Sequence, residues 1–327
     1  MMTSIKGEAL TMLKKIFFLI AFFLLWGCTS GDARSETISV DLTVPEIAVR
    51  QDVTYAQYLT WPEARLKMDL LLPMEGDKKS PAVIFIPGGS WVVSPKAAGS
   101  QFTYRLAEEG YAVASIEYRL IAAANYREIL GDVKAAVRYL RAHAEELNID
   151  KDRIAVMGVS AGGYLAAMAG VTGGIREFDF GDNMEESSRV QAVIDIFGPT
   201  DLTRVAADYS REKQQSYASP GSPFSLLVNG AGGYKGNKGE SLLDTPETAT
   251  AACPLTYIGK DTPPFLIMHG TADTTISPSQ SQHLLEALEQ QGIYAEHYSI
   301  EGADHKFKYF FQPKAFSIIL SFLHKVL

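Results

Sequence analysis

The sequence predicts an α/β fold in which helices cover both faces of a mostly parallel sheet. Five short runs are apolar at all or nearly all positions, which is typical of strands buried on both faces: 82–86, 112–116, 154–157, 192–197 and 265–268. Segments with helical spacing alternate with these runs: 100–109, 129–147, 161–169 and 279–291. Buried strands that alternate with helices indicate a parallel sheet with helices on both sides.

The chain begins with a predicted targeting segment, residues 1–28. Lys14 and Lys15 precede an apolar run, 16–26, that has the length of a signal-peptide core and is too short to cross a bilayer. The run leads into Leu-Trp-Gly-Cys, which resembles a bacterial lipoprotein signal, where Cys28 is lipidated and becomes the mature N-terminus. Trp26 departs from the small residue usual in that position. The alternative is an ordinary secretory peptide with an incidental cysteine.

This interpretation predicts an exported protein, anchored by lipid on the periplasmic or cell-surface face of a bacterial membrane. Several acyl chains, at roughly 0.8 kcal/mol per buried CH₂, hold a protein on a membrane almost permanently. Residues 29–51 are predicted to be a tether, because their first part is polar and rich in Thr and Ser. Residues 52–327 are then long enough for one large α/β domain.

Composition limits the classes of partner. The formal net charge is −8, and it becomes about −10 without the targeting segment, which holds three lysines and one glutamate. This charge disfavours nucleic acid and anionic membrane surfaces as partners. Cys253 is the one cysteine left after residue 28. No intrachain disulfide is then available, so stability must come from the core.

Two segments near the start of the domain alternate with period two. Apolar residues alternate with Lys67 and Asp69 in 66–72, and 53–57 shows a similar pattern. Strands with one polar face are expected to be antiparallel and at the edge of a sheet. At the other end of the chain, 298–300 is predicted as the last strand, followed by a closing helix, 316–327.

The pattern GxSxG stands between the apolar run 154–157 and the helical segment 161–169. This strand-turn-helix context is the one that a nucleophile elbow requires. Gly158 and Gly162 let strand and helix pass close together, so that the hydroxyl of Ser160 is exposed at the end of the strand. Ser160 is therefore the predicted nucleophile.

Several further strings, in the right order, resemble the α/β-hydrolase superfamily and its bacterial esterase branch with an HGGGW-type loop, which includes acetyl-xylan and feruloyl esterases. The strings are PGGSW at 87–91, EYRL at 117–120, the segment 132–163, FGPTDL at 197–202 and PPFLIMHGTAD at 263–273. The resemblance covers nearly all of the chain from about residue 52. It implies the α/β-hydrolase fold, with a cap inserted at about 199–260.

The serine hydroxyl is a poor nucleophile at neutral pH and needs a base. His305 follows the last predicted strand on a short loop, where the α/β-hydrolase base lies. At the position of His269 the family usually has a histidine that supports the loop. The remaining histidines are expected to be structural or solvated: His143, His283, His297 and His324.

The base needs a carboxylate that fixes its tautomer. Asp273 follows the strand 265–268, fits the family position and completes the order Ser, Asp, His. Asp304 is adjacent to His305, and neighbouring side chains generally point apart. Asp195, inside a buried strand, is the more credible alternative, because some relatives place the acid after the preceding strand.

An oxyanion hole is predicted from backbone N–H groups. One belongs to Ala161, which follows the nucleophile, and Gly89 and Ser90 are the favoured donors of the preceding loop. Pro87 and Ser90 depart from the family pattern, which has histidine and glycine there. The alternative is an ordinary glycine turn. Trp91 and Tyr164 stand close in sequence to these residues, and they either wall a pocket for substrate or fill the core.

The resemblance implies a serine carboxylic-ester hydrolase that removes acetyl or other small acyl groups from carbohydrate esters through an acyl-enzyme, with no metal or organic cofactor. A peptidase of the prolyl-oligopeptidase kind shares the catalytic half, but it carries a large propeller for which the residues before Asp52 are too few. A catalytically inactive binding protein is the other alternative, motivated by the altered oxyanion loop.

Overall fold

The computed structural model describes residues 39, 45–58, 64–74, 78–233, 236 and 239–327. The predicted targeting segment, Cys28 and most of the predicted tether lie outside the described residues. Residues 44–327 form one unit by their internal contacts, and the description below concerns that unit alone. No helix in the described ranges is both long enough and apolar enough to span a membrane.

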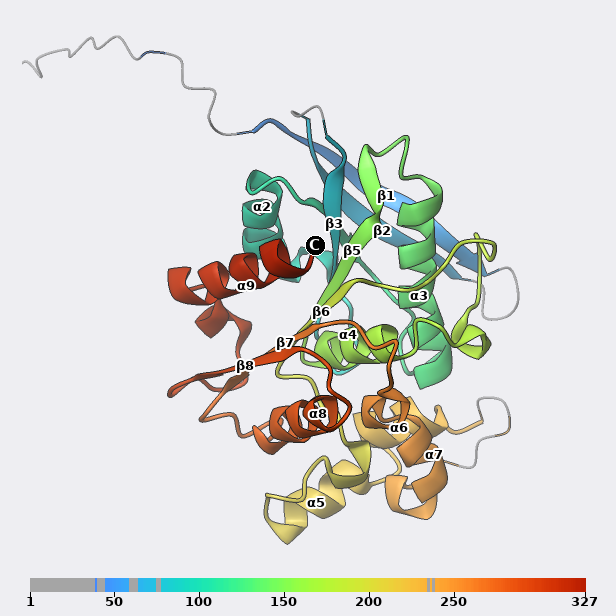
Figure 1. Ribbon diagram of the computed structural model, residues 1–327. Coiled ribbons are helices and arrows are strands. Elements are labelled where there is room, and N and C mark those ends of the chain that lie inside the picture. Colours follow the sequence, from blue (N-terminus) through green and yellow to red (C-terminus); the bar gives the residue numbers. More distant parts are fainter. Residues whose placement is uncertain (1–38, 40–44, 59–63, 75–77, 234–235, 237–238) are drawn as a thin grey trace, which may run out of the picture. The chain divides into compact units, whose positions relative to one another are not determined.

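One sheet of eight strands runs through the described part of the unit, in the order β1-β2-β4-β3-β5-β6-β7-β8 (Figure 1). Its strands are β1 (Ile47–Tyr58), β2 (Ala64–Pro73), β3 (Ser80–Ile86), β4 (Ala112–Ile116), β5 (Ile149–Val159), β6 (Ala192–Ile196), β7 (Phe265–Gly270) and β8 (Ala295–Ile300). The strands β3 to β8 pair in parallel, whereas β1 and β2 are antiparallel. The predicted mostly parallel sheet with an antiparallel edge is thus confirmed.

Helices cover both faces of this sheet (Figure 1). On one face pack α3 (Tyr126–Ala142), α4 (Ala161–Val171) and α8 (Ser279–Gln290), and on the other pack α2 (Ser100–Glu108) and α9 (Pro313–Val326). Successive strand side chains point to opposite faces. Ile84 therefore joins the first core and Phe85 the second. This division explains why the central strands are apolar at nearly every position, with Ser115 and Asp195 as buried exceptions.

The edge strand begins earlier than the sequence predicted. Ile47 pairs with Pro73 and Arg50 with Leu70, so residues 47–51 belong to β1 and not to the tether. Irregular register in this strand puts Tyr55 and Ala56, although adjacent, both in the core. Such bulges break the period-two pattern, which is why the sequence did not reveal the whole strand.

Helix α3 also differs from the predicted 129–147. It begins at Tyr126 because the Asn125 side chain accepts a hydrogen bond from the N–H of Arg127 (3.1 Å). The Glu128 carboxylate in turn accepts one from the N–H of Asn125 (2.8 Å), which completes a capping box. The helix ends at Ala142, before the turns that lead into β5.

The predicted cap segment, 199–260, lies between β6 and β7 and is called the insertion below. It contains the helices α5 (Arg211–Ala218), α6 (Pro223–Asn229) and α7 (Pro246–Ala251). In Figure 1 these three helices gather below the sheet, next to α8. The insertion thus brings helices to one end of the sheet without adding a strand in its described residues.

Candidate active site

Ser160 stands at the sharp turn between β5 and α4. Its backbone has φ 56° and ψ −118°, a conformation that non-glycine residues rarely adopt. The turn is held because the N–H of Ser160 donates to the carbonyl of Ile196 (2.9 Å). A Cβ added to Gly158 would lie 1.9 Å from the carbonyl oxygen of Gly162, so strand and helix approach more closely than any larger residue permits.

The Ser160 hydroxyl is within hydrogen-bond distance of a histidine. Its Oγ lies 2.8 Å from Nε2 of His305, which follows β8 on a short loop. The imidazole packs against the ring of Phe197 at a centroid distance of 4.6 Å. A base in this position can take the serine proton as the oxygen attacks.

A buried carboxylate lies on the other side of this imidazole. Oδ2 of Asp273 is 2.6 Å from Nδ1 of His305, while Oδ1 accepts hydrogen bonds from the N–H groups of Thr275 (2.8 Å) and Ile276 (3.0 Å). The Nδ1 proton donates to this carboxylate, which leaves Nε2 free to accept the proton of Ser160. Each residue follows a different parallel strand, and the carboxyl ends of those strands meet at one edge of the sheet.

A second histidine touches the same carboxylate. Nε2 of His269 lies 3.2 Å from Oδ2 of Asp273, and Nδ1 lies 2.7 Å from the hydroxyl of Ser281. Burial on its own raises the pKa of Asp273, but the hydrogen bonds from His269 and His305 outweigh burial and hold that pKa below its usual value. Asp273 therefore stays ionised beside the imidazole at neutral pH.

The other two candidate carboxylates do not reach His305. Oδ1 of Asp195 accepts a hydrogen bond from the N–H of Gly198 (2.9 Å), and Oδ2 is buried with no partner among the described residues. Burial raises the pKa of Asp195 to about 6. Asp304 pairs with Lys306 instead.

The predicted oxyanion loop is tightly turned. Gly89 and Ser90 both have positive φ, 140° and 52°. The Gly89 carbonyl accepts the N–H groups of Val92 (2.9 Å) and Val93 (3.2 Å). In the described part of the chain no acceptor pairs with the N–H groups of Gly89, Ser90 or Ala161. Unpaired donors beside Ser160 are what a developing oxyanion requires.

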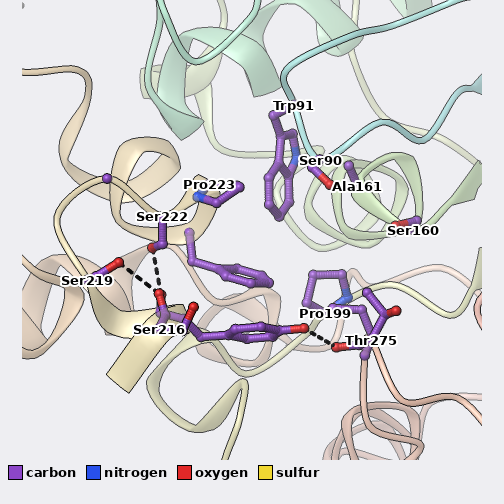
Figure 2. Close-up of a pocket in the computed structure, with 14 residues that line it drawn as sticks. Ser90, Trp91, Ser160, Ala161, Pro199, Ser216, Ser219, Ser222, Pro223 and Thr275 are labelled. Atoms are coloured by element: carbon purple, nitrogen blue, oxygen red, sulfur yellow. Dashed lines mark hydrogen bonds between the residues drawn. The ribbon is translucent and has the colours of Figure 1, made fainter. Parts of the chain in front are cut away.

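A pocket of about 370 Å³ opens at Ser160 (Figure 2). The core contributes Ser90, Trp91 and Ala161 to its lining, and the insertion contributes residues between 216 and 224. Among the latter, the rings of Tyr217 and Phe224 stack at a centroid distance of 5.0 Å. The insertion therefore forms one side of the pocket that contains Ser160.

Comparison with known proteins assigns the chain to a family. Residues 68–288, more than half of the sequence, match the BD-FAE family. The chain belongs to the BD-FAE family.

Curated relatives of this BD-FAE protein have esterase names. It is 29% identical over 259 residues (79% of this chain, 51% of the relative) to a probable isoprenylcysteine alpha-carbonyl methylesterase, ICMEL1, of Arabidopsis thaliana. It is 30% identical over 213 residues (64% of this chain, 49% of the relative) to the esterase LipC of Mycobacterium tuberculosis. The chain thus spans about half the length of the curated relatives it matches.

Two solved structures are similar over most of the chain. A truncated form of a carbohydrate esterase from gut microbiota superposes with a TM-score of 0.74 at 27% identity, covering 88% of this chain and 99% of that one. A bifunctional GH43-CE protein of Bacteroides eggerthii gives a TM-score of 0.73 at 30% identity, covering 85% of this chain and 38% of that one. These likenesses, with the sheet described above, establish the α/β-hydrolase fold.

The two aromatic residues considered for the pocket have different positions in the BD-FAE protein. Trp91 lines the pocket, where its ring meets Phe224 edge-on at 5.7 Å. Tyr164 does not line it: the side chain is fully buried behind Trp91, at 5.5 Å, and its hydroxyl donates to the carbonyl of Ala252 (2.8 Å). Tyr164 fills the core because α4 packs against the insertion there.

Sequence reasoning missed several residues around the site. Tyr118 donates its hydroxyl to the carbonyl of Pro87 (2.9 Å), and so it braces the predicted oxyanion loop at its first residue. The signal was present in the string EYRL, but nothing in the sequence indicated which residue the tyrosine contacts. Tyr217 and Phe224 were missed because the insertion has no strong pattern.

Proposed function

We propose that this protein is a serine carboxylic-ester hydrolase that removes acetyl or other small acyl groups from carbohydrate esters. The observation that carries the proposal is the chain of hydrogen bonds from Ser160 through His305 to Asp273, at the edge of a pocket. The names of similar proteins, a carbohydrate esterase and a GH43-CE protein among them, support the choice of ester and of carbohydrate.

In the first half of the reaction, Ser160 attacks the ester carbonyl and His305 takes its proton. The oxygen of the tetrahedral intermediate receives hydrogen bonds from Ala161 and from the loop at Gly89 and Ser90, and Asp273 stabilises the imidazolium. His305 then gives the proton to the departing alcohol oxygen. An acyl group remains on Ser160.

In the second half, water enters the place that the alcohol has left. His305 removes a proton from the water, whose oxygen attacks the acyl carbon, and the same N–H groups receive the charge. Collapse of this intermediate returns the proton to Ser160 and releases the acid. The proton of Ser160 leaves with the alcohol in the first half, and a proton from water replaces it in the second, so the enzyme ends the cycle unchanged.

The lining of the pocket supports a small, partly polar substrate. Trp91, Tyr217 and Phe224 offer aromatic surface, and hydroxyl groups stand at Ser90, Ser216, Ser219 and Ser222 (Figure 2). Aromatic faces pack against sugar rings and short acyl chains, while hydroxyl groups bond to sugar oxygens. An acylated sugar has both kinds of surface.

We also propose that the protein is exported and anchored by lipid on Cys28, so that its substrate is met outside the cytoplasm. The support is the sequence alone, in which a short apolar core runs into Leu-Trp-Gly-Cys. Growth of an expressing bacterium with a radiolabelled fatty acid tests this proposal. Label should enter the wild type and be absent from Cys28→Ser, whereas label in neither protein contradicts the anchor.

The decisive experiment measures the products released from acetylated and feruloylated oligosaccharides by mass spectrometry, beside simple lipid esters and dipeptide amides. Release of acetate or a small aromatic acid by the wild type, and not by Ser160→Ala, supports the proposal. Cleavage of amides in preference to esters favours a peptidase of the prolyl-oligopeptidase kind. Failure of Ser160 to react with a fluorophosphonate, together with no product, favours an inactive binding protein.

A further inference from the structure

The insertion helix α5, together with Tyr209 just before its N-cap, is joined to the loop that carries Asp273. We call residues 271–278, between β7 and α8, the acid loop. Tyr209 donates its hydroxyl to the carbonyl of Asp273 (3.4 Å), and Tyr217 donates its hydroxyl to that of Thr275 (2.8 Å). Between them, Nζ of Lys213 donates to the carbonyl of Thr274. Three successive carbonyls of the acid loop thus accept side-chain donors from one segment.

Two of these donors lie on the helix itself. Lys213 and Tyr217 are four residues apart on α5, which places one above the other on a helix face. Tyr209 precedes the N-cap Ser210, whose side chain accepts the N–H of Lys213 (3.4 Å) and whose backbone is extended, with ψ 155°. The ammonium group also lies 3.5 Å from the ring centroid of Tyr209 and 5.2 Å from that of Tyr217. We call these three side chains the clamp.

The clamp binds the backbone carbonyls of the acid loop, whereas bonds within the loop hold the Asp273 carboxylate. The Asp273 carboxylate is held from within by the N–H groups of Thr275 and Ile276. The carbonyls of residues 273–275 face the opposite way, toward α5. The carboxylate of Asp208, next to the clamp, accepts hydrogen bonds from the hydroxyls of Ser277 (2.5 Å) and Ser279. The loop is therefore fixed between the sheet on one side and the insertion on the other.

We infer that Tyr209, Lys213 and Tyr217 are positioning residues, which keep the Asp273 carboxylate on Nδ1 of His305. This inference rests on the proposed function, in which that hydrogen bond orients the base. The ring of Tyr217 also lines the pocket beside Ser160, while its hydroxyl bonds to the acid loop, as the dashed line ending at Thr275 in Figure 2 shows. One side chain thus links the wall that substrate touches to the carboxylate that serves catalysis.

The double variant Tyr209→Phe/Tyr217→Phe tests the clamp without changing charge or removing a ring. Loss of two bonds lets the acid loop shift, and displacements of about 1 Å at a catalytic group cost up to about 10²-fold. We expect kcat on p-nitrophenyl acetate to fall about tenfold or more while KM changes by less than about twofold. The matched control is Tyr257→Phe, which removes a hydroxyl bond within the insertion, to the carbonyl of Ala251 (2.7 Å).

A double-mutant cycle separates positioning from a general loosening of the insertion. In an Asp273→Asn background the clamp has no carboxylate to place, so the two Tyr→Phe changes should cost less than about twofold in kcat. An equal loss in both backgrounds overturns the inference. In addition, Lys213→Met should lower kcat and Lys213→Arg, which keeps a donor, should restore most of it.

A spectroscopic readout decides the question without substrate. The proton between Nδ1 of His305 and Asp273, at 2.6 Å, should give a far-downfield NMR resonance. In the double variant this resonance should move upfield or broaden, and in Tyr257→Phe it should stay. An unchanged resonance in the double variant, with kcat equal to that of Tyr257→Phe, overturns the inference. If the wild type lacks hydrolysis that depends on Ser160, the proposed function fails, and the resonance still tests the clamp.

Discussion

The hydroxyl of Ser160 lies 2.8 Å from Nε2 of His305, although the two residues are 145 positions apart in sequence. The two residues follow β5 and β8, which are parallel strands of the same sheet with β6 and β7 between them. Their carboxyl ends lie at one edge, where Asp273 follows β7. The sheet is therefore the element that turns three distant segments into one site.

Removal of the proposed nucleophile, Ser160, should abolish turnover. We expect Ser160→Ala to lower kcat on p-nitrophenyl acetate by about 10⁴ or more, because in the described part of the chain the hydroxyl hydrogen-bonded to Nε2 of His305 is that of Ser160. Steady-state kinetics on purified protein measures this loss. Ser317→Ala, an exposed serine on α9, is the control and should retain wild-type kcat. Turnover that persists in Ser160→Ala contradicts the assignment.

The oxyanion loop should not tolerate a side chain at Gly89. Its φ of 140° is a glycine conformation, and an added Cβ would lie 2.3 Å from the carbonyl oxygen of Val93. We expect Gly89→Ala to displace the loop's N–H donors and to lower kcat by about 10²–10³. Gly232→Ala, where a Cβ meets open space, serves as the control. Equal kcat values for the two variants would place the oxyanion donors elsewhere.

The ring of Phe224 should limit the size of the substrate. It lies between Trp91 and Tyr217, 5.7 Å and 5.0 Å from their rings, and it lines the pocket. Phe224→Ala should enlarge the pocket and raise kcat/KM for p-nitrophenyl butyrate relative to acetate by about tenfold. The comparison is with Leu243→Ala, which removes an apolar side chain that is 72% exposed on the same insertion. A ratio that is unchanged in Phe224→Ala would mean that this wall does not meet the acyl group.

Asp195 should make the protein less stable as pH rises. Its pKa is raised by burial to about 6, against 3.8 for an unperturbed aspartate. Between these two pH values the folded state binds more protons than the unfolded state, so the free energy of unfolding falls as pH increases. This decrease in the free energy of unfolding is complete above about pH 6 and amounts to roughly 3 kcal/mol.

Asp195→Asn cannot ionise and should lose this dependence. Urea unfolding from pH 4 to 7 measures it: the free energy of unfolding of the variant, relative to wild type, should rise by up to about 3 kcal/mol over that range. Asp273 acts in the opposite direction, because its lowered pKa contributes stability that is lost only as pH falls below the unfolded value. Asp261→Asn, which removes an exposed carboxylate, is the control. If the free energy of unfolding changed with pH in the same way for Asp195→Asn and wild type, the prediction would be wrong.

Much of the fold was predictable because the central strands are buried on both faces. Burial on both faces leaves an apolar run with few polar residues, as at 112–116, where Ser115 is the one polar residue and where the predicted and observed bounds agree. The turn at Ser160 was predictable for a different reason, since its glycines are required by backbone contacts within a few residues of the motif. Where a strand is exposed and bulged, as at 47–51, the same reasoning failed.

The sequence by itself determined which residues can supply a hydroxyl, a base and a carboxylate, because chemical type and local spacing are written in it. Only the tertiary structure decided that Asp273 and not Asp195 contacts His305, and that Tyr164 stands behind Trp91 outside the pocket. It also decided that α5 reaches the acid loop. These are contacts between segments that are distant in sequence, and they depend on how the chain packs, which no local pattern of residues encodes.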